Sequence, residues 1–342
     1  MIRTIRTPHW RAFWHMLVLA LCLSGFSGAA RADSCVAGMT NVSFGAVSPI
    51  AGSDYYANGT LTVTCTWTLG NLLTAVLPTA SLCVNLEGGP GGTIPARVMK
   101  NGGASMPFNL YRDNTYSTAS IWGSTSGGSA QPVTGSIAGV LGLGVQTLTA
   151  TIYGKIPAAS LAGVPISNGT DTVYTADFSG AATLQYSFGG LLAAGTACKT
   201  GTTVPFSFKA TATVKNDCII NTSPLAFPGD NRVLSSAVRT TGTLSVLCTA
   251  GSPYQISLNG GSVANNPAAR KMASAVGRDT IGYEISNVVD GPVWGDGTGG
   301  TVTVTGTGSG APQALRLYGR VPAQKTPAPG DYKDTVTATL MF

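Results

Sequence analysis

The strongest constraint on the fold is a pair of cysteines that recurs with the same spacing. Cys35 and Cys65 are 30 residues apart, and so are Cys218 and Cys248. Such self-similarity indicates that the chain contains two copies of one structural unit.

Further short motifs repeat around these cysteines. Residues 59–65 (GTLTVTC) match 242–248 (GTLSVLC), and residues 153–158 (YGKIPA) match 318–323 (YGRVPA). Residues 177–188 likewise match residues 331–342. Each copy has one phenylalanine 21 residues before its second cysteine, Phe44 or Phe227, and one Trp-Gly, at Trp122 or Trp294. We therefore expect domain one at residues 33–215 and domain two at residues 216–342.

The first 32 residues have the organisation of a secretory signal peptide. Basic residues precede the apolar stretch 16–23, and Ala30-Arg31-Ala32 forms a small-x-small cleavage site. Removal of residues 1–32 takes away four arginines, so the net charge falls from +6 to about +2, which removes the electrostatic case for a nucleic-acid partner.

The predicted cleavage also removes His9 and His15, the two histidines of the chain. Catalytic arrangements of serine or cysteine with histidine are thereby excluded, as are histidine-ligated metal sites. The remaining acidic residues show no catalytic spacing. We therefore expect no enzymatic activity and no cofactor.

Six cysteines remain, and an even number in an exported chain indicates disulfides. The repeat predicts the pairs Cys35–Cys65 and Cys218–Cys248, which leaves Cys83 to pair with Cys198 inside domain one. A zinc site is the rival interpretation, but the chain has no C-x-x-C motif and the spacings are long.

Short runs of alternating residues predict an all-β fold. Leu61, Val63 and Cys65 share one face of a strand whose other face carries threonines, and residues 335–342 show the same period of two. Only 34 of 342 residues are charged, and 45 are glycine, which fits antiparallel β-sandwiches with tight turns.

Domain one has an extension with no counterpart in domain two. It covers residues 189–217 and alternates between apolar and polar positions from Val204 to Val214. A linker is the alternative interpretation, but linkers rarely alternate in this way. We expect an extra strand that completes domain one, whereas domain two lacks its last strand.

These motifs resemble the spore coat protein U domain, notably the cysteine pair, residues 294–297 (WGDG), 318–322 (YGRVP) and 330–340 (GDYKDTVTATL). The two-domain layout resembles the tip adhesin of archaic (Csu-type) chaperone–usher pili. The resemblance implies two tandem immunoglobulin-like, pilin-type β-sandwiches, the second incomplete until a neighbouring subunit adds a strand. It also implies a periplasmic chaperone, an outer-membrane usher and export through the periplasm to the pilus tip.

The predicted N-terminus favours a tip position over a shaft position. Only Asp33 and Ser34 would precede Cys35 after cleavage, and at ~3.3 Å per residue they are too short to donate a strand. In domain two, the edge that a chaperone and then a donor strand would cover is expected at Val336, Ala338, Leu340 and Phe342.

Three apolar segments of domain one are candidates for a surface-binding site. In an immunoglobulin-type sandwich they fall in loops at the end opposite domain two. Exposed apolar patches usually mark interaction sites, so we expect binding to abiotic or host surfaces and biofilm formation; packing of the segments into the core is the competing interpretation. The candidate residues are Leu69, Leu72, Leu73, Val76, Leu77, Ile137, Val140, Leu141, Leu143, Leu191 and Leu192.

Two other features have plainer interpretations. Trp122 and Trp294 occupy matching positions and are expected in the core or at a sheet edge, while Arg270, Lys271 and Arg278 are expected to form a solvated basic cluster. The functional alternatives to a surface adhesin are a sugar-binding lectin at the pilus tip and a coat or shaft subunit without a ligand.

Overall fold

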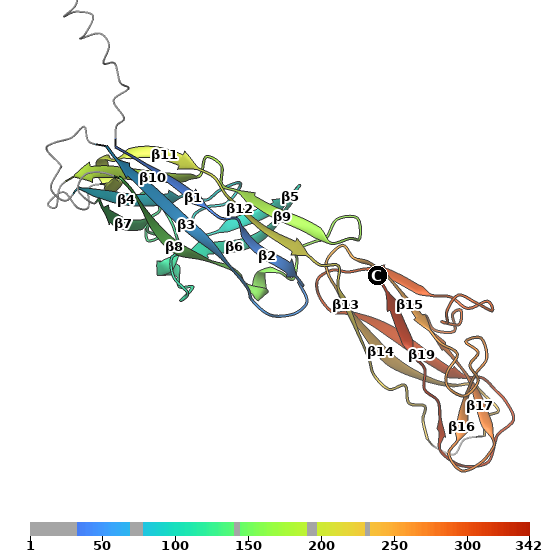
Figure 1. Ribbon diagram of the computed structural model, residues 1–342. Helices are drawn as coiled ribbons and strands as arrows, with labels where there is room; N and C mark the ends of the chain where they lie inside the picture. The colour runs from blue at the N-terminus through green and yellow to red at the C-terminus, as the bar shows by residue number, and fades with distance from the viewer. Residues whose placement is uncertain (1–32, 69–77, 140–143, 190–196, 230–232) are drawn as a thin grey trace, which may run out of the picture.

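The computed structural model describes residues 33–68, 78–139, 144–189, 197–229 and 233–342. The described residues are almost entirely β-strand, and they form two pairs of sheets joined end to end (Figure 1). The all-β prediction and the two-domain layout are confirmed. Among the described residues, no helix is long and apolar enough to cross a membrane.

Domain one contains two sheets that share one core. The larger sheet has the order β1-β3-β8-β6-β5-β9-β12-β2, and the smaller has the order β11-β10-β4-β7. Its short helices are η1 (Thr118–Ser120), η2 (Ala158–Ser160) and α2 (Ala197–Thr200). Its strands are β1 (Ser34–Met39), β2 (Val42–Val47), β3 (Tyr55–Trp67), β4 (Thr79–Leu86), β5 (Arg97–Asn101), β6 (Ala104–Tyr111), β7 (Val133–Ala138), β8 (Gly144–Ile156), β9 (Thr172–Asp177), β10 (Ala182–Gly189), β11 (Thr202–Phe206) and β12 (Lys209–Val214).

Domain two repeats this plan with fewer strands. Its sheets have the orders β13-β14-β19-β17-β16-β20 and β18-β15-β21. Its strands are β13 (Cys218–Thr222), β14 (Val238–Cys248), β15 (Pro253–Leu258), β16 (Arg270–Ser274), β17 (Thr280–Ser286), β18 (Val304–Thr307), β19 (Gln313–Val321), β20 (Tyr332–Lys333) and β21 (Ala338–Met341). Strand by strand they correspond to β1 and β3–β10, so β2, β11 and β12 have no counterpart among the strands of domain two.

The extension after β10 forms strands, as the alternation predicts, but it forms two strands and not one. β11 pairs with β10 in the smaller sheet, whereas β12 lies between β9 and β2 in the larger sheet. A strand that crosses from one sheet to the other turns a corner of the sandwich. Pro205 pairs with Thr183 on the edge strand β11, where a missing N–H breaks no interior ladder.

All three predicted disulfides are present. Cys35–Cys65 joins the paired positions of β1 and β3, and Cys218–Cys248 does the same for β13 and β14. Cys83–Cys198 links β4 to α2, with a Cα–Cα distance of 5.3 Å. Because 115 residues separate these two cysteines, this bridge closes a much longer loop than the other two.

The tryptophans are core residues in both domains, as expected. Trp122 and Trp294 are completely buried, and their indole N–H groups donate to the carbonyls of Val84 and Ile256 at 2.9 and 3.0 Å. The indole N–H groups of these two tryptophans are therefore paired despite their burial.

The expected basic cluster in domain two is wrong for Arg270. Its side chain is 1% exposed and donates to the carbonyls of Leu258 and Trp294 at 3.1 and 2.9 Å. Arg97 does the same in domain one, with bonds to Leu86 and Trp122. Burial lowers the pKa of Arg97 to about 10, so the guanidinium stays charged at neutral pH and holds the tryptophan loop to the sheet.

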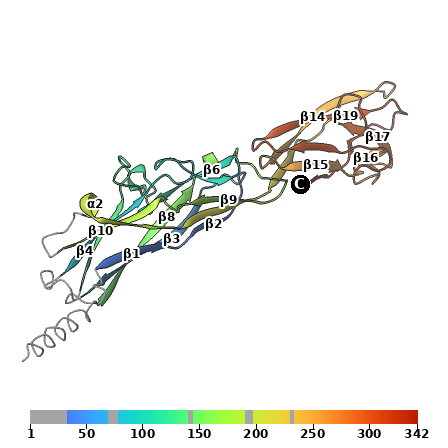
Figure 2. The same ribbon diagram turned by 90° about the horizontal axis from the view of Figure 1, so that it is seen from above.

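The two domains meet through hydrogen bonds on both sides of the connecting residues. Asn216 receives a bond from Ser252 of domain two and donates to Asp171 of domain one. The Ile166 amide donates to the carbonyl of Ala250 at 2.9 Å. Figures 1 and 2 both place the C-terminus at the end of domain two that faces domain one.

Candidate functional site

The end of domain one away from domain two is formed by strand ends that converge there (Figure 1). Trp67 at the end of β3 pairs with Gly144 at the start of β8, and Gly189 at the end of β10 pairs with Thr79 at the start of β4. The Gly139 amide donates to the carbonyl of Pro78 at 2.7 Å. The three apolar segments therefore all leave from and return to the same end of the sandwich.

Most of the predicted surface-binding residues lie outside the described residues, so their exposure stays a prediction. These are Leu69, Leu72, Leu73, Val76, Leu77, Val140, Leu141, Leu143, Leu191 and Leu192.

Ile137 is described, and it differs from the expectation. It lies in β7 opposite Ala80, is 7% exposed and packs in the core. The strand continues to Ala138 because β4 pairs with it along its whole length. Ile137 is therefore a core residue and not part of an exposed loop.

Aromatic rings and a disulfide support the distal end of domain one. Phe188 packs edge-on against Trp67 and Tyr186, with ring centroids 5.8 and 5.6 Å apart. Cys83–Cys198 ties α2 to the middle of β4. The strand ends next to the three segments are thus held by the Cys83–Cys198 disulfide and by packing of Phe188 against Trp67 and Tyr186.

The second candidate surface is the open edge of domain two. In domain one, β12 lies against β9, and Tyr174 and Ala176 of β9 are 1% and 0% exposed. In domain two, no strand of the described residues lies beyond β20, whose Tyr332 is half-buried. An edge strand presents unpaired N–H and C=O groups, which is a template for an added strand.

Matched core positions near this edge differ in burial. Met99 and Met106 face each other across β5 and β6 and are completely buried. Their counterparts Met272 and Ile281 face each other across β16 and β17 but are only half-buried. Domain two thus exposes apolar surface that domain one covers.

In domain two, the segment that matches β2 has no counterpart of β12 to pair with among the described residues. Phe44 of β2 is 8% exposed, whereas Phe227, at the matching position, lies outside any strand and is half-buried. The sequence predicted that domain two lacks a strand, but it placed the open edge at residues 336–342 and did not locate the slot between the Phe227 segment and β20. The sequence of the Phe227 segment itself does not show whether a strand lies beside it.

The four residues predicted to line the edge of domain two have mixed positions. Ala338 and Leu340 are half-buried in β21, Val336 is half-buried before it, and Phe342 is 53% exposed after it. β21 pairs with β15 on one side only. Tyr283 donates to Asp334 at 2.7 Å, and Asp334 in turn accepts from the Ser262 amide, which fixes the turn before β21.

The strand register corrects the repeat in this region. Leu340 pairs with Ile256 as Leu184 pairs with Val84. Ile256 corresponds to Val84 because the carbonyl of each accepts from the buried Trp-Gly tryptophan of its domain. The counterpart of Leu340 is therefore Leu184, whereas the sequence match aligns it with Tyr186. A two-residue shift keeps the same side chains facing inward, so alternation cannot detect it.

Titratable groups do not gather into a metal site in the part of the chain that the structure describes. Burial raises the pKa of Tyr283, and hydrogen bonds from Tyr283 and Ser262 outweigh the opposite effect of burial to hold the pKa of Asp334 below its usual value. Both groups serve the turn that precedes β21.

The architecture is that of two tandem β-sandwich domains with a shared strand plan and one disulfide-linked strand pair each. The chain belongs to the spore coat protein U domain family, whose model matches residues 21–176 and 204–339. The resemblance seen in the motifs is thereby confirmed.

Individual relatives are more distant. Protein U of Myxococcus xanthus is 34% identical over 111 residues, which are 30% of this chain and 59% of that protein. Among solved structures, the CsuC–CsuE chaperone–tip adhesion subunit complex of archaic chaperone-usher Csu pili of Acinetobacter baumannii has a TM-score of 0.49, with 14% identity over 90% of this chain and 100% of that chain. A chaperone–tip adhesin complex of CFA/I fimbriae has a TM-score of 0.30 with 13% identity, covering 89% and 94%. At these TM-scores, neither likeness adds to the family assignment.

Proposed function

We propose that this protein is a non-enzymatic tip subunit of an archaic chaperone–usher pilus that mediates surface adhesion and biofilm formation. The observation that carries the proposal is the difference between the two domains along one edge. Domain one has β12 between β9 and β2, and domain two has an open slot at the same place. One domain is complete within the chain, and the other receives a strand from the next subunit.

The family match supports this division of roles. The second family match begins at residue 204, ahead of Cys218 and of the expected start of domain two at residue 216. This leading part of the match contains β12, which lies in the sheet of domain one. The connection between the domains is thus an intramolecular version of the strand addition by which a pilin would fill the slot of domain two.

In this proposal a periplasmic chaperone covers the open edge of domain two before assembly, and an outer-membrane usher exchanges it for a pilin donor strand. Half-buried residues such as Leu340 and Phe227 would become fully buried in each complex. Covering such apolar surface contributes ~25 cal/mol per Å² removed from water.

Adhesion is assigned to the distal end of domain one. The described residues that flank the apolar segments 69–77, 140–143 and 190–196 lie at the end of domain one away from domain two (Figure 1). Several leucines together would bind an apolar abiotic or host surface, and many pili would multiply this through avidity.

The test of adhesion uses charge substitutions at Leu72, Leu73, Leu141, Leu143, Leu191 and Leu192. Attachment to plastic should be lost while pili are still assembled, because exposed leucines carry binding and not folding. Loss of pili in every variant would show that these leucines belong to the core. Normal pili with normal attachment would favour the sugar-binding alternative.

The test of position uses an epitope-tagged chain imaged on cells. Label confined to fibre ends supports a tip subunit, and label along the fibres would instead indicate a shaft or coat subunit. This outcome does not depend on which residues bind the surface, so the two parts of the proposal are tested separately.

A further inference from the structure

Domain two has a cavity of about 450 Å³ on the outer face of its larger sheet. Its lining residues come from β14, β17, β19 and the loop that follows β17. Its size is within the range of small-ligand sites. Its charged lining residues are Arg239, Glu284, Asp290 and Arg320, and its apolar walls include Val289, Val293 and Tyr318.

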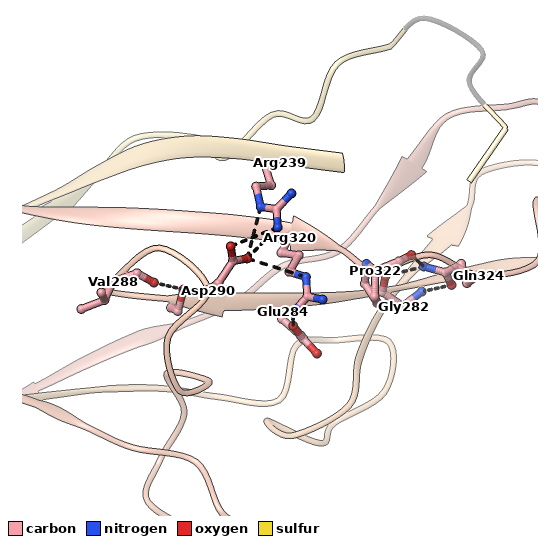
Figure 3. Close-up of polar contacts among 9 residues, drawn as sticks. Arg239, Gly282, Glu284, Val288, Asp290, Arg320, Pro322 and Gln324 are labelled. Carbon is pink, nitrogen blue, oxygen red and sulfur yellow. Dashed lines mark hydrogen bonds and ion pairs between the residues drawn. The ribbon is translucent and has the colours of Figure 1, made fainter. Parts of the chain in front are cut away.

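The charges in the cavity balance one another. Arg239 donates to both carboxylate oxygens of Asp290 at 3.0 Å, and Arg320 donates to Glu284 at 3.4 Å (Figure 3). Two cations thus face two anions, which argues against a strongly charged ligand. Guanidinium groups retain flat faces that stack on aromatic rings even when their edges are paired.

Domain one shows what covers the same surface there. Tyr56 and Lys155 are paired across β3 and β8 as Arg239 and Arg320 are paired across β14 and β19. Tyr111 corresponds to Ser286, since each pairs with the tyrosine two residues before that Lys155 or Arg320. Large rings therefore stand in domain one where domain two has smaller or straight side chains.

A residue in the loop above the sheet also carries a ring in domain one and a smaller side chain in domain two. Tyr116 and Asp290 both have a left-handed backbone, with φ of 53° and 51°. The ring of Tyr116 lies 4.8 Å from Tyr56 and 5.4 Å from Tyr111, and Lys155 Nζ lies 6.0 Å from its centroid. Asp290 contacts Arg239 and Arg320 as Tyr116 contacts Lys155, but it has no ring. The volume that Tyr116 and Tyr111 fill in domain one is therefore open in domain two.

From this comparison we infer that the cavity of domain two binds a tyrosine side chain presented by a partner protein. The ring takes the place that Tyr116 and Tyr111 occupy in domain one, between the guanidinium groups and the walls formed by Val289, Val293 and Tyr318. The phenolic hydroxyl donates to the carboxylate of Glu284 or Asp290. An uncharged ring with one hydrogen-bonding group matches both the balanced charge and the mixed lining.

The experiment is an NMR titration of the full chain, exported and purified from the periplasm, with N-acetyl-tyrosinamide. Saturable shifts are expected for residues 284–293 and 318–320 and not for the matching surface of domain one. N-acetyl-leucinamide should bind at least about tenfold more weakly, because it cannot stack or donate from a hydroxyl. Absence of saturable shifts, or equal binding of the leucine compound, would overturn the inference.

Two variants fill the cavity in the way domain one does. Ser286→Tyr copies Tyr111, and Asp290→Tyr copies Tyr116; each should weaken binding at least about tenfold, whereas the exposed control Ser309→Tyr should leave it unchanged. Asp290 is exposed at the loop tip, so its variant tests the site even if Ser286→Tyr does not fold. Unchanged binding in the folded variants would refute the assignment.

A last comparison identifies the source of the ring. A Gly-Tyr-Gly peptide with blocked ends should bind at least as tightly as p-cresol if a protein side chain is the natural occupant. Markedly tighter binding of p-cresol would contradict a protein partner and indicate a free phenolic compound.

Discussion

Domain one and domain two share a strand order, but among the described residues only domain one has a strand, β12, between β9 and β2. There β12 is paired on both sides, antiparallel to β9 and parallel to β2. In domain two the matching segment around Phe227 forms no strand, and β20 is a short edge. Where β12 is present, the segments on both sides of it form the strands β9 and β2; where it is absent, their counterparts form only the short β20 and no strand.

The same difference extends into the core. Leu184 is completely buried, whereas its counterpart Leu340 is half-buried. The two leucines pair with matching residues, Val84 and Ile256, so the difference in their burial depends on which strands lie beside them. The core of each domain is therefore completed by the strand that lies along its open edge. Substitutions at matching positions of the two domains test this comparison.

The largest effect is expected for the disulfide that domain two lacks. Replacing Cys83 and Cys198 by alanine should lower the free energy of unfolding of domain one by about 4–5 kcal/mol, because the bridge closes a long loop. Calorimetry of the full chain should show the loss in one transition only. Replacing Cys218 and Cys248, which close a shorter loop, should cost domain two about 3–4 kcal/mol. Equal shifts of both transitions in either variant would contradict the separation of the domains.

A similar effect is expected when β12 loses its anchor. Phe208, just before β12, is 3% exposed and stacks on Phe178 and Trp122 at 4.7 and 6.0 Å. Phe208→Ala should destabilise domain one by about 3–5 kcal/mol, measured by denaturant unfolding. The exposed neighbour provides the control, since Ser207→Ala should change stability by less than ~0.5 kcal/mol. A small effect of Phe208→Ala would mean that the extension is dispensable.

An intermediate effect is expected when domain two is offered the strand that it lacks. A peptide with the sequence of residues 202–215 should raise the unfolding free energy of domain two by about 2.7 kcal/mol at 100 times its dissociation constant. The transition of domain one should not move, since its slot is occupied. The same peptide with aspartate at the positions of Ala210 and Ala212 serves as the control. Stabilisation of domain one by the peptide would show that β12 does not fill its slot stably.

The smallest effect is a difference between matched leucines. Leu184→Ala should cost about 2–5 kcal/mol, as for a fully buried leucine, and Leu340→Ala about half as much because its side chain is half in water. Adding the strand peptide should increase the cost at Leu340 and leave that at Leu184 unchanged. Equal costs without the peptide would show that the edge of domain two is already covered.

Much of this organisation was predictable from local sequence. The cysteine spacing predicted three disulfides that the structure contains, and alternation at Leu61 and Val63 predicted which side chains are buried. The repeat of Trp-Gly predicted two buried tryptophans. Each of these depends on residues that are close in sequence or repeated, so the pattern itself contains the information.

Other features were not predictable from the same patterns. Arginine is usually a surface residue, and the burial of Arg270 is explained by its hydrogen bonds to the carbonyls of Leu258 and Trp294. Ile137 stands beside glycines that suggest a loop, but pairing with Ala80 keeps it in a strand. In both cases a partner distant in sequence satisfies the polar groups or covers the apolar ones.

The amino-acid sequence by itself determined the two copies, the disulfide pairs, the β-strand content and the extra strand-forming segment of domain one. Only the tertiary structure decided that this segment divides between two sheets, that Leu340 stands in the place of Leu184, and that domain two has a cavity where domain one has tyrosine rings. The physical reason is that a period of two assigns a side chain to a face of a sheet, but not to a neighbour. Register, coverage of an edge and the filling of a surface depend on which strands lie side by side, and that is set by the packing of the whole domain.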